Sequence, residues 1–358
     1  MSKRLKIILA FGLVAQIIGL RFLKYFPEFV ETVYSNGIYK WISQLMHYAF
    51  GWLPFSFGDL FYTVGGILII RWLILHRKRI FKDTVNWSID ILSTISILYF
   101  AFHALWAFNY YRLPLHQSLQ LKATYSTESL MHVTQNLIDR TNSIHNSLSL
   151  SDTLKIEYNF DKTELLNKVP LGYQELSKQY SHLAYNTKSI KRSLYSIPLT
   201  YMGFSGYLNP FTNEAQIDGL IPGFKYPSTA SHEVAHQLGY AAENEANFIG
   251  SLAAIHHPDI YFRYSGYAFA LNHCLGELYK RAPKQYDKFI EQINTGVLKN
   301  YNDVSLFWER YKNPLEPLFK TTYSGFLKAN NQSAGIKSYS YVVALYVNYF
   351  EQSKLLNR

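Results

Sequence analysis

Cysteine is almost absent from this sequence: Cys274 is the only one in 358 residues. A single cysteine excludes an internal disulfide framework and any zinc site built from several cysteines. It says little about the compartment, because an oxidising space tolerates a lone buried thiol. A metal site in this chain would therefore have to be built from other ligands, such as histidine and carboxylate.

Charged residues are also scarce. They make up 17% of the chain, while 30 tyrosines and 24 phenylalanines help to bring the aromatic residues to 17%. A typical soluble protein is about one quarter charged, so contact with lipid explains this composition. The formal net charge of +10 could suggest nucleic acid, but the densest basic run, residues 76–79, directly follows an apolar stretch. Such a run is typical of a membrane flank and no nucleic-acid-binding motif accompanies it, so we predict no nucleic-acid partner.

Three apolar runs predict membrane spans near residues 7–23, 60–75 and 89–108. The first is followed by Tyr25, Phe26 and Pro27 rather than by the small residues of a cleavage site, which favours an uncleaved anchor over a signal peptide. Asp90 and His103 lie in the third run, and we interpret them as an interfacial carboxylate and a satisfied interior histidine. Residues 1–112 are thus predicted to form an anchor in the lipid bilayer, and residues 113–358 a domain with its own core.

Basic residues predict the orientation of the anchor. They concentrate in the N-terminal tail and in the loop over residues 76–82, so both segments should face the cytoplasm. Three spans then place everything after residue 112 on the extracytoplasmic side. Arg21 and Lys24 argue against this orientation, because they would lie on the outer side.

Beyond the spans the sequence patterns are mainly helical. A short interfacial helix is expected at 38–46, and residues 193–217 predict short strands and turns, because alternating and aromatic residues are broken there by Gly203, Gly206 and Pro210. The expected fold is an α-helical membrane anchor followed by a mainly α domain of the α+β class with a small sheet. Helices are expected at 124–148, 165–183, 228–254, 267–279, 284–294, 304–312 and 339–355.

The segment His232-Glu233-Val-Ala-His236 carries the chemistry. On a helix this spacing places both imidazoles on one face, where they can bind one Zn²⁺, and Glu233 can act as general base on a water held by the metal. A chain of this composition contains such a motif by chance in roughly two cases in a hundred. Its context strengthens it, because Pro227 precedes the motif as a helix-start signal and Gly239 follows as a stop signal.

A catalytic zinc site needs a third protein ligand and one open position. Glu243 and Glu245 are the two candidates. The spacing Glu243-x-x-x-Asn247 is similar to that of the glutamate zincins, in which the first residue binds the metal and the last orients a metal-binding histidine, and this favours Glu243. The linker after His236 is shorter than in most glutamate zincins and one residue longer than in metzincins.

Two further parts of a peptidase site have candidates. Residues 206–217 could supply the edge strand on which zincins align an extended peptide, although an ordinary hairpin explains the same pattern equally well. A phenol or imidazole near the metal could bind the developing oxyanion. The candidates for that role are His256, His257, Tyr264, Tyr341 and Tyr339, of which we select Tyr339 as the catalytic tyrosine.

These residues carry a family resemblance. Pro210-Phe-Thr, His232-Glu-x-x-His-Gln-x-Gly-Tyr, Glu243-x-Glu-Ala-Asn-Phe, Tyr264-Ser-Gly-Tyr and the late Ser338-Tyr resemble the domain of unknown function 3810 family of bacterial membrane proteins. The resemblance covers nearly the whole chain, including the spans. It implies a zincin-like fold and a zinc peptidase, with the substrate unassigned.

The leading hypothesis is a zinc-dependent metallopeptidase that hydrolyses protein or peptide at the outer face of a bacterial inner membrane, with Glu233 as general base. A second hypothesis keeps the metal and changes the substrate to a cell-wall peptide or another amide. A third is a non-catalytic, membrane-tethered binding or assembly module in which zinc is structural or lost. An intramembrane protease is disfavoured, because Glu243, Asn244, Glu245 and Asn247 are too polar for lipid exposure.

Overall fold

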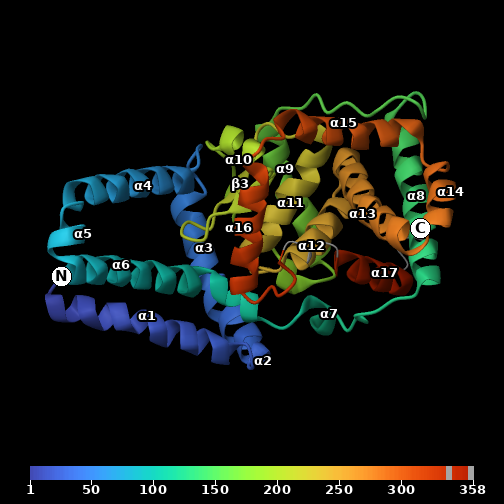
Figure 1. The fold of residues 1–358 in the computed structure, drawn as a ribbon. Coiled ribbons are helices and arrows are strands. Elements are labelled where there is room, and N and C mark those ends of the chain that lie inside the picture. Colours follow the sequence, from blue (N-terminus) through green and yellow to red (C-terminus); the bar gives the residue numbers. More distant parts are fainter. Residues whose placement is uncertain (336–340, 354–358) are drawn as a thin grey trace.

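The computed structural model describes residues 1–335 and 341–353. Its chain has two parts: three long helices project to one side, and the other helices surround a small sheet on the opposite side (Figure 1). The fold is mostly helical, which confirms the predicted anchor helices and the small sheet at this coarse level.

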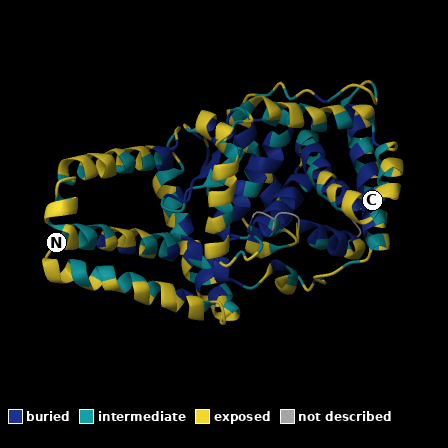
Figure 2. Ribbon diagram, viewed as in Figure 1, coloured by how far each residue is buried: buried dark blue, intermediate teal, exposed yellow. Residues whose placement is uncertain are grey.

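Three helices are long and apolar enough to cross a membrane: α1 (Lys3–Leu23), α4 (Phe57–His76) and α6 (Thr84–Leu105). Most of their apolar side chains are exposed (Figure 2), and Phe11 is 75% exposed. A surface of this kind is unfavourable in water and favourable against lipid. The helices therefore indicate a membrane protein, and the third one occupies residues 84–105 instead of 89–108.

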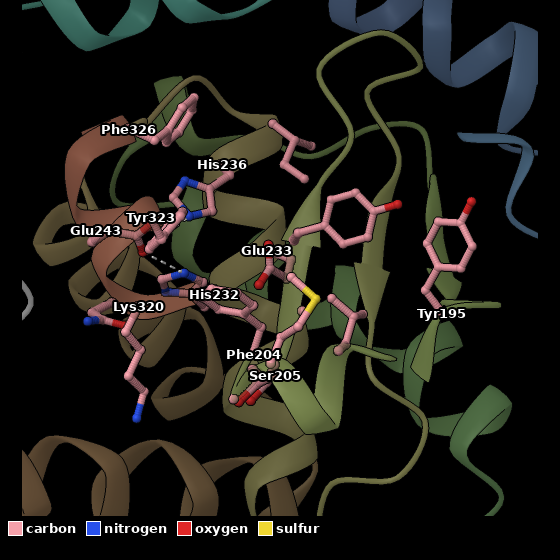
Figure 3. A pocket seen from close by; sticks show the side chains of 18 of the residues that line it. Tyr195, Phe204, Ser205, His232, Glu233, His236, Glu243, Lys320, Tyr323 and Phe326 are labelled. Carbon is pink, nitrogen blue, oxygen red and sulfur yellow. Dashed lines mark hydrogen bonds and ion pairs between the residues drawn. The ribbon is translucent and has the colours of Figure 1, made fainter. Parts of the chain in front are cut away.

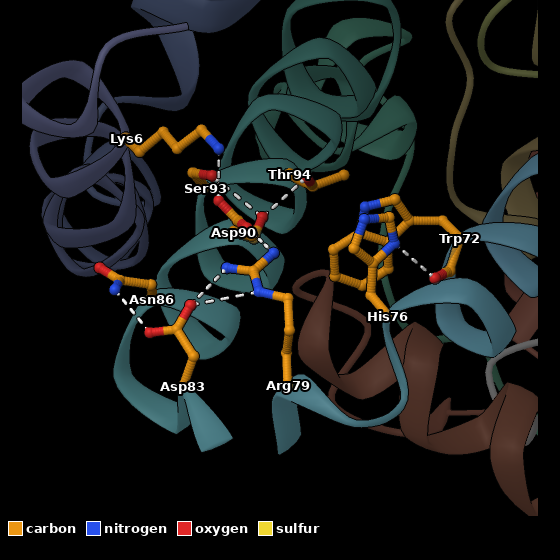
Figure 4. Close-up of polar contacts among 9 residues, drawn as sticks. All are labelled: Lys6, Trp72, His76, Arg79, Asp83, Asn86, Asp90, Ser93 and Thr94. Atoms are coloured by element: carbon orange, nitrogen blue, oxygen red, sulfur yellow. Dashed lines mark hydrogen bonds and ion pairs between the residues drawn. The ribbon is translucent and has the colours of Figure 1, made fainter. Parts of the chain in front are cut away.

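A cluster of charged side chains joins these helices at one end (Figure 4). Lys6 Nζ lies 2.5 Å from one carboxylate oxygen of Asp90, and Arg79 Nη1 lies 2.9 Å from the other. Arg79 also contacts Asp83. Asp90 is tolerated near the membrane because two cations neutralise it. The cluster ties α1 to the start of α6 and to α5 (Arg79–Lys82).

Segments between the apolar helices and directly after the last of them pack against the rest of the chain. Ser43 Oγ donates a hydrogen bond to Asn213 Oδ1 at 2.9 Å, and the Arg112 guanidinium pairs with Glu31 at 2.6 Å and donates to the carbonyl of Gly239. These contacts cross the boundary that the sequence suggests at residue 112, so the anchor and the domain share one interface. The segments are α2 (Pro27–Phe29), η1 (Val30–Ile38), α3 (Tyr39–Phe50), η2 (Ala107–Tyr111) and α7 (Leu115–Ser118).

The sheet has three short strands in the order β1-β3-β2. Strand β1 (Ile190–Arg192) runs parallel to β3 (Ala215–Ile217), and β2 (Gly206–Leu208) runs antiparallel to β3. Strand β2 is therefore an edge strand on one side of the sheet.

Helices cover the sheet and form a single large core with it, rich in leucine, isoleucine and aromatic side chains. The most extensive packing joins α11 to α12 and α8 to α13. The helices are α8 (Thr127–Leu148), α9 (Lys162–Ser177), η3 (Ser181–Leu183), α10 (Ser196–Met202), η4 (Gly223–Lys225), α11 (Tyr226–Gln237), α12 (Glu243–Ile255), α13 (Ile260–Arg281), α14 (Pro283–Ile290), α15 (Thr295–Tyr311), α16 (Glu316–Ala329) and α17 (Val342–Gln352).

Three local predictions differ from the structure. Residues 196–202 form helix α10 within the segment expected to hold only strands and turns, and Gly203 ends that helix at φ +79°. The helical pattern over 228–254 forms two helices, because Gly239, the predicted stop signal, takes φ +87° and ends the first of them. Helix α16 lies in a segment for which the sequence patterns gave no helix.

Candidate metal centre

Helix α11 is held rigidly by side chains from distant parts of the chain. Trp106 Nε1 donates a hydrogen bond to the carbonyl of His236 at 3.1 Å, and the Tyr39 hydroxyl donates to the carbonyl of Gln237 at 2.9 Å. These donors satisfy carbonyls of the last turn that have no partner within the helix. The two histidines are thereby fixed in position by the anchor segments as well as by the domain core.

The turn after α11 selects the tautomer of His236. Because Gly239 is in the left-handed region, the chain reverses and brings the carbonyl of Tyr240 back to the ring, where it accepts a hydrogen bond from His236 Nδ1 at 2.7 Å. A side chain at Gly239 would also collide with Asn109. With the proton on Nδ1, the lone pair of Nε2 faces the site.

Close packing of α12 against α11 brings Glu243 to both histidines. A Cβ atom at Gly250 would lie 2.6 Å from the backbone nitrogen of His232, so only glycine allows the helices to approach this closely. Glu243 Oε2 then lies 3.3 Å from His232 Nε2 and 3.6 Å from His236 Nε2. Its other oxygen, Oε1, accepts a short hydrogen bond from the Tyr323 hydroxyl on α16.

Glu233 lies next to the histidines (Figure 3). Its ligand atom and those of His232 and His236 are all within 4.8 Å of one another. Gly206 on β2 makes room for this carboxylate, since a Cβ there would lie 2.7 Å from Glu233 Oε1. Burial, reinforced by the charge of Glu243, raises the pKa of Glu233 to about 8. A divalent cation beside it would lower that pKa again.

The charges of the site are those of a cation site. Burial alone would lower the pKa of His236, but the nearby Glu243 and Glu233 raise it to about 9. Burial would raise the pKa of Glu243, yet His236 and hydrogen bonds to both histidines hold it well below its usual range. The pKa of His232 is lowered, mainly by burial. One protonated histidine thus balances Glu243, and a bound cation would take over that positive charge.

Unpartnered atoms give an independent test of whether a metal fits. Among the described residues, Glu233 Oε2 is buried without a hydrogen-bond donor, and Glu243 Oε2 has no close neighbouring donor besides the two imidazoles at 3.3 and 3.6 Å. Leaving such an acceptor unsatisfied costs about 1–3 kcal/mol, and more when it is charged. Two imidazole nitrogens and one carboxylate are a common catalytic ligand set for Zn²⁺. His232, His236 and Glu243 therefore fit the ion.

Glu245 faces away from this site. Its Oε1 accepts a hydrogen bond from the backbone N–H of Leu115 at 2.6 Å, and Arg112 is a neighbouring charge. Burial raises its pKa to about 7. The structure thus brings Glu243, and not Glu245, to the histidines.

The remaining predicted residues lie in different places. Asn247 lines the cavity near His232, but Asn247 Nδ2 and His232 Nδ1 are both buried without a hydrogen-bond partner, so the orienting role stays a prediction. His257 Nε2 donates to the carbonyl of Lys168, His256 Nδ1 donates to that of Leu252, and the Tyr264 hydroxyl donates to Asn300, so these three side chains have structural partners. Tyr339 lies outside the described residues.

A cavity of about 1200 Å³ contains the candidate metal centre. Its walls come from α11 and α12, from β2 and α10, from α16, and from the membrane helices α4 and α6. Sequence patterns missed Tyr323 and Lys320, which α16 contributes to this wall. A helix-start signal was present, since Pro317 stands in the first turn of α16, but nothing in the sequence links that helix to Glu243.

Comparison with known proteins gives one match. A family model described as "Protein of unknown function (DUF3810)" matches residues 34–347. No curated protein and no solved structure matches the chain.

Proposed function

The chain belongs to the DUF3810 family of proteins of unknown function, and we propose from its site that it is a membrane-anchored zinc metallopeptidase with a zincin-like centre. One observation carries this proposal: two histidine Nε2 atoms converge on Glu243 Oε2, at 3.3 and 3.6 Å, with the carboxylate of Glu233 beside them in a large cavity. Three ligands and a neighbouring base are the composition of a catalytic zinc site rather than a structural one.

The protein's own residues divide the work. His232, His236 and Glu243 hold the ion, and Tyr323 fixes the carboxylate of Glu243 by donating to its other oxygen. A bound Zn²⁺ would supply the Lewis acid that makes water nucleophilic near neutral pH. Glu233 would accept a proton from the attacking water and deliver it to the leaving amine.

Strand β2 offers the means to hold a peptide. The backbone N–H of Asn209 donates to the carbonyl of Glu214 at 2.9 Å. This bond shows which residues of β2 are hydrogen-bonded to β3 and which are not. Because ladder bonds alternate along an antiparallel pair, the backbone groups of Gly206 and Leu208 point to the free edge. Both residues line the cavity. An extended peptide can therefore pair with β2 through its backbone, independently of its side chains.

Metal removal tests the proposed activity. The full-length protein, purified in detergent, should cleave members of a mixed peptide library, and a panel of cell-wall peptides tested in parallel would reveal an amidase instead. Chelation to a metal-free state should abolish cleavage, and Zn²⁺ should restore it, because the ion supplies the Lewis acid. Cleavage that persists in metal-free protein would contradict the mechanism. Failure of the zinc-loaded protein on both panels would reject the enzyme assignment.

We further propose that the site lies on the extracytoplasmic side of a bacterial inner membrane, with the basic tail and the loop over 76–82 inside. Cys274 is fully buried, so it should not react with a labelling reagent that is used to detect introduced cysteines. A membrane-impermeant maleimide should label Leu150→Cys, whose parent side chain is fully exposed, in intact spheroplasts. Lys78→Cys should react only after the membrane is dissolved. The reverse pattern would invert the topology.

A further inference from the structure

The cavity of the metal centre continues along the membrane helices. Four residues of α6 line it, Ile95, Leu98, Tyr99 and Phe102, together with Tyr62 of α4. The four positions on α6 are spaced i, i+3, i+4 and i+7, so they form one face of that helix. One wall of the site is thus a helix face within a predicted span.

The opposite face of α6 is already occupied, because α1 packs along it. Gln16 Nε2 donates to Ser96 Oγ at 2.9 Å, and Gly12 of α1 lies beside the same serine. Helix α4, in contrast, stands apart from α6 in Figure 1, and no described helix packs along its length. On the cavity-facing side of α6, Phe102 contacts Phe326 of α16 with ring centroids 5.9 Å apart, and no described helix packs extensively along the rest of that face.

In the part of the chain that the structure describes, the contacts that fix helix α4 lie near its two ends. At the domain end, Glu214 accepts hydrogen bonds from the backbone N–H groups of Phe57 and Gly58, and Asp59 accepts one from the N–H of Leu194 at 2.7 Å. At the far end, the rings of Trp72 and Trp87 stack with centroids 6.3 Å apart. These contacts hold α4 at both ends, and the cavity reaches between Tyr62 of α4 and the cavity-facing residues of α6.

The dimensions of this space select its occupant. From Phe102 to Ile95 the α6 face extends roughly 10 Å into the span, at 1.5 Å per residue. The whole cavity, about 1200 Å³, exceeds the range of about 300–1,000 Å³ that is usual for small ligands. An apolar helix face of this spacing is the surface that another apolar helix packs against.

We propose that the substrate is a membrane protein whose transmembrane helix docks between α4 and α6, so that the chain just outside the membrane reaches β2 and the metal centre. This inference rests on the proposed peptidase function. It names the substrate class: a membrane-spanning protein cut close to the membrane surface, with the bond to be cleaved presented by the tethered helix.

Photo-crosslinking tests this docking without requiring turnover. Benzoylphenylalanine is placed at position 98, on the cavity face of α6, or at position 11, where Phe11 of α1 is 75% exposed. Each full-length protein, in the Glu233→Gln background, is reconstituted with a leucine–alanine helix of about 20 residues that carries a short polar peptide. A second probe has the same polar peptide on a palmitoyl chain.

Position 98 should capture the helical probe several-fold more than position 11, and more than it captures the palmitoyl probe. Equal capture at both positions would mean simple partition into lipid and would overturn the proposal, as would preference for the palmitoyl probe. Position 95 replaces position 98 if the latter protein does not retain its metal. Selective capture without cleavage by the wild type would reject the peptidase and keep the docking site. Cleavage of an unanchored peptide without selective capture would keep the peptidase function and reject the docking site.

Discussion

Replacing Glu233 by glutamine should abolish peptide hydrolysis while the metal stays bound. The amide has the size of the carboxylate, so it still fits against Gly206, but it cannot accept the proton of the attacking water. Loss of a general base costs about 10²–10⁴-fold in rate. Both kcat/KM and metal content are measured on the full-length protein, with Glu245→Gln as a matched buried control outside the site.

The metal content of Glu233→Gln separates the two roles open to this residue. Its carboxylate lies close enough to both histidines to be a fourth protein ligand, which would close the site and make the zinc structural. Loss of metal in Glu233→Gln, with no activity in the wild type, would therefore favour the non-catalytic module. Full activity of the variant would show that another group takes the proton.

The histidine pair could be predicted because its geometry is local. A spacing of four residues places His232 and His236 on one face of any helix, whatever the rest of the fold does. The choice between Glu243 and Glu245 needed the structure, since it depends on where α12 begins and how it packs. Two positions apart on a helix lie about 200° apart, so only one of them can face the histidines.

Contacts between segments that are distant in the sequence could not be predicted from it. Tyr323 reaches Glu243 from a helix 80 residues further along, and Trp106 reaches the carbonyl of His236 across 130 residues. Neither pairing follows from a period or a turn signal. The boundary predicted at residue 112 was too sharp for the same reason. Composition separates apolar segments from mixed ones, but it does not show that the segments between the spans pack against α11.

The prediction of short helices and strands failed for another reason. Residues 193–199 alternate over too few positions to distinguish a strand from a helix. Ser196–Met202 is a helix, with Pro198 in its first turns and Gly203 at its end, and both signals favour a helix of this length. The sequence therefore predicted a mostly helical fold with a small sheet and the placing of His232 and His236 together, and left the short elements and the long-range contacts undetermined.

Glu243→Ala should remove the metal, whereas Glu245→Ala should keep it. Glu243 contributes the carboxylate that both histidines approach, and no other described carboxylate except Glu233 belongs to that cluster. Outer partners of a ligand alone change metal affinity by about 10–100-fold, so loss of a ligand should exceed that range. Affinity is measured by competition with a chromophoric chelator on the full-length protein in detergent.

Both variants should also lose stability in the metal-free state. Removing the Glu245 carboxylate leaves the N–H of Leu115 buried without its acceptor, at a cost of about 1–3 kcal/mol. Metal-free Glu245→Ala should therefore melt at a lower temperature than metal-free wild type, and metal-free Glu243→Ala should do so too, because it removes the buried carboxylate that pairs with protonated His236. Metal loss in Glu245→Ala with retention in Glu243→Ala would exchange the two roles and contradict the ligand set.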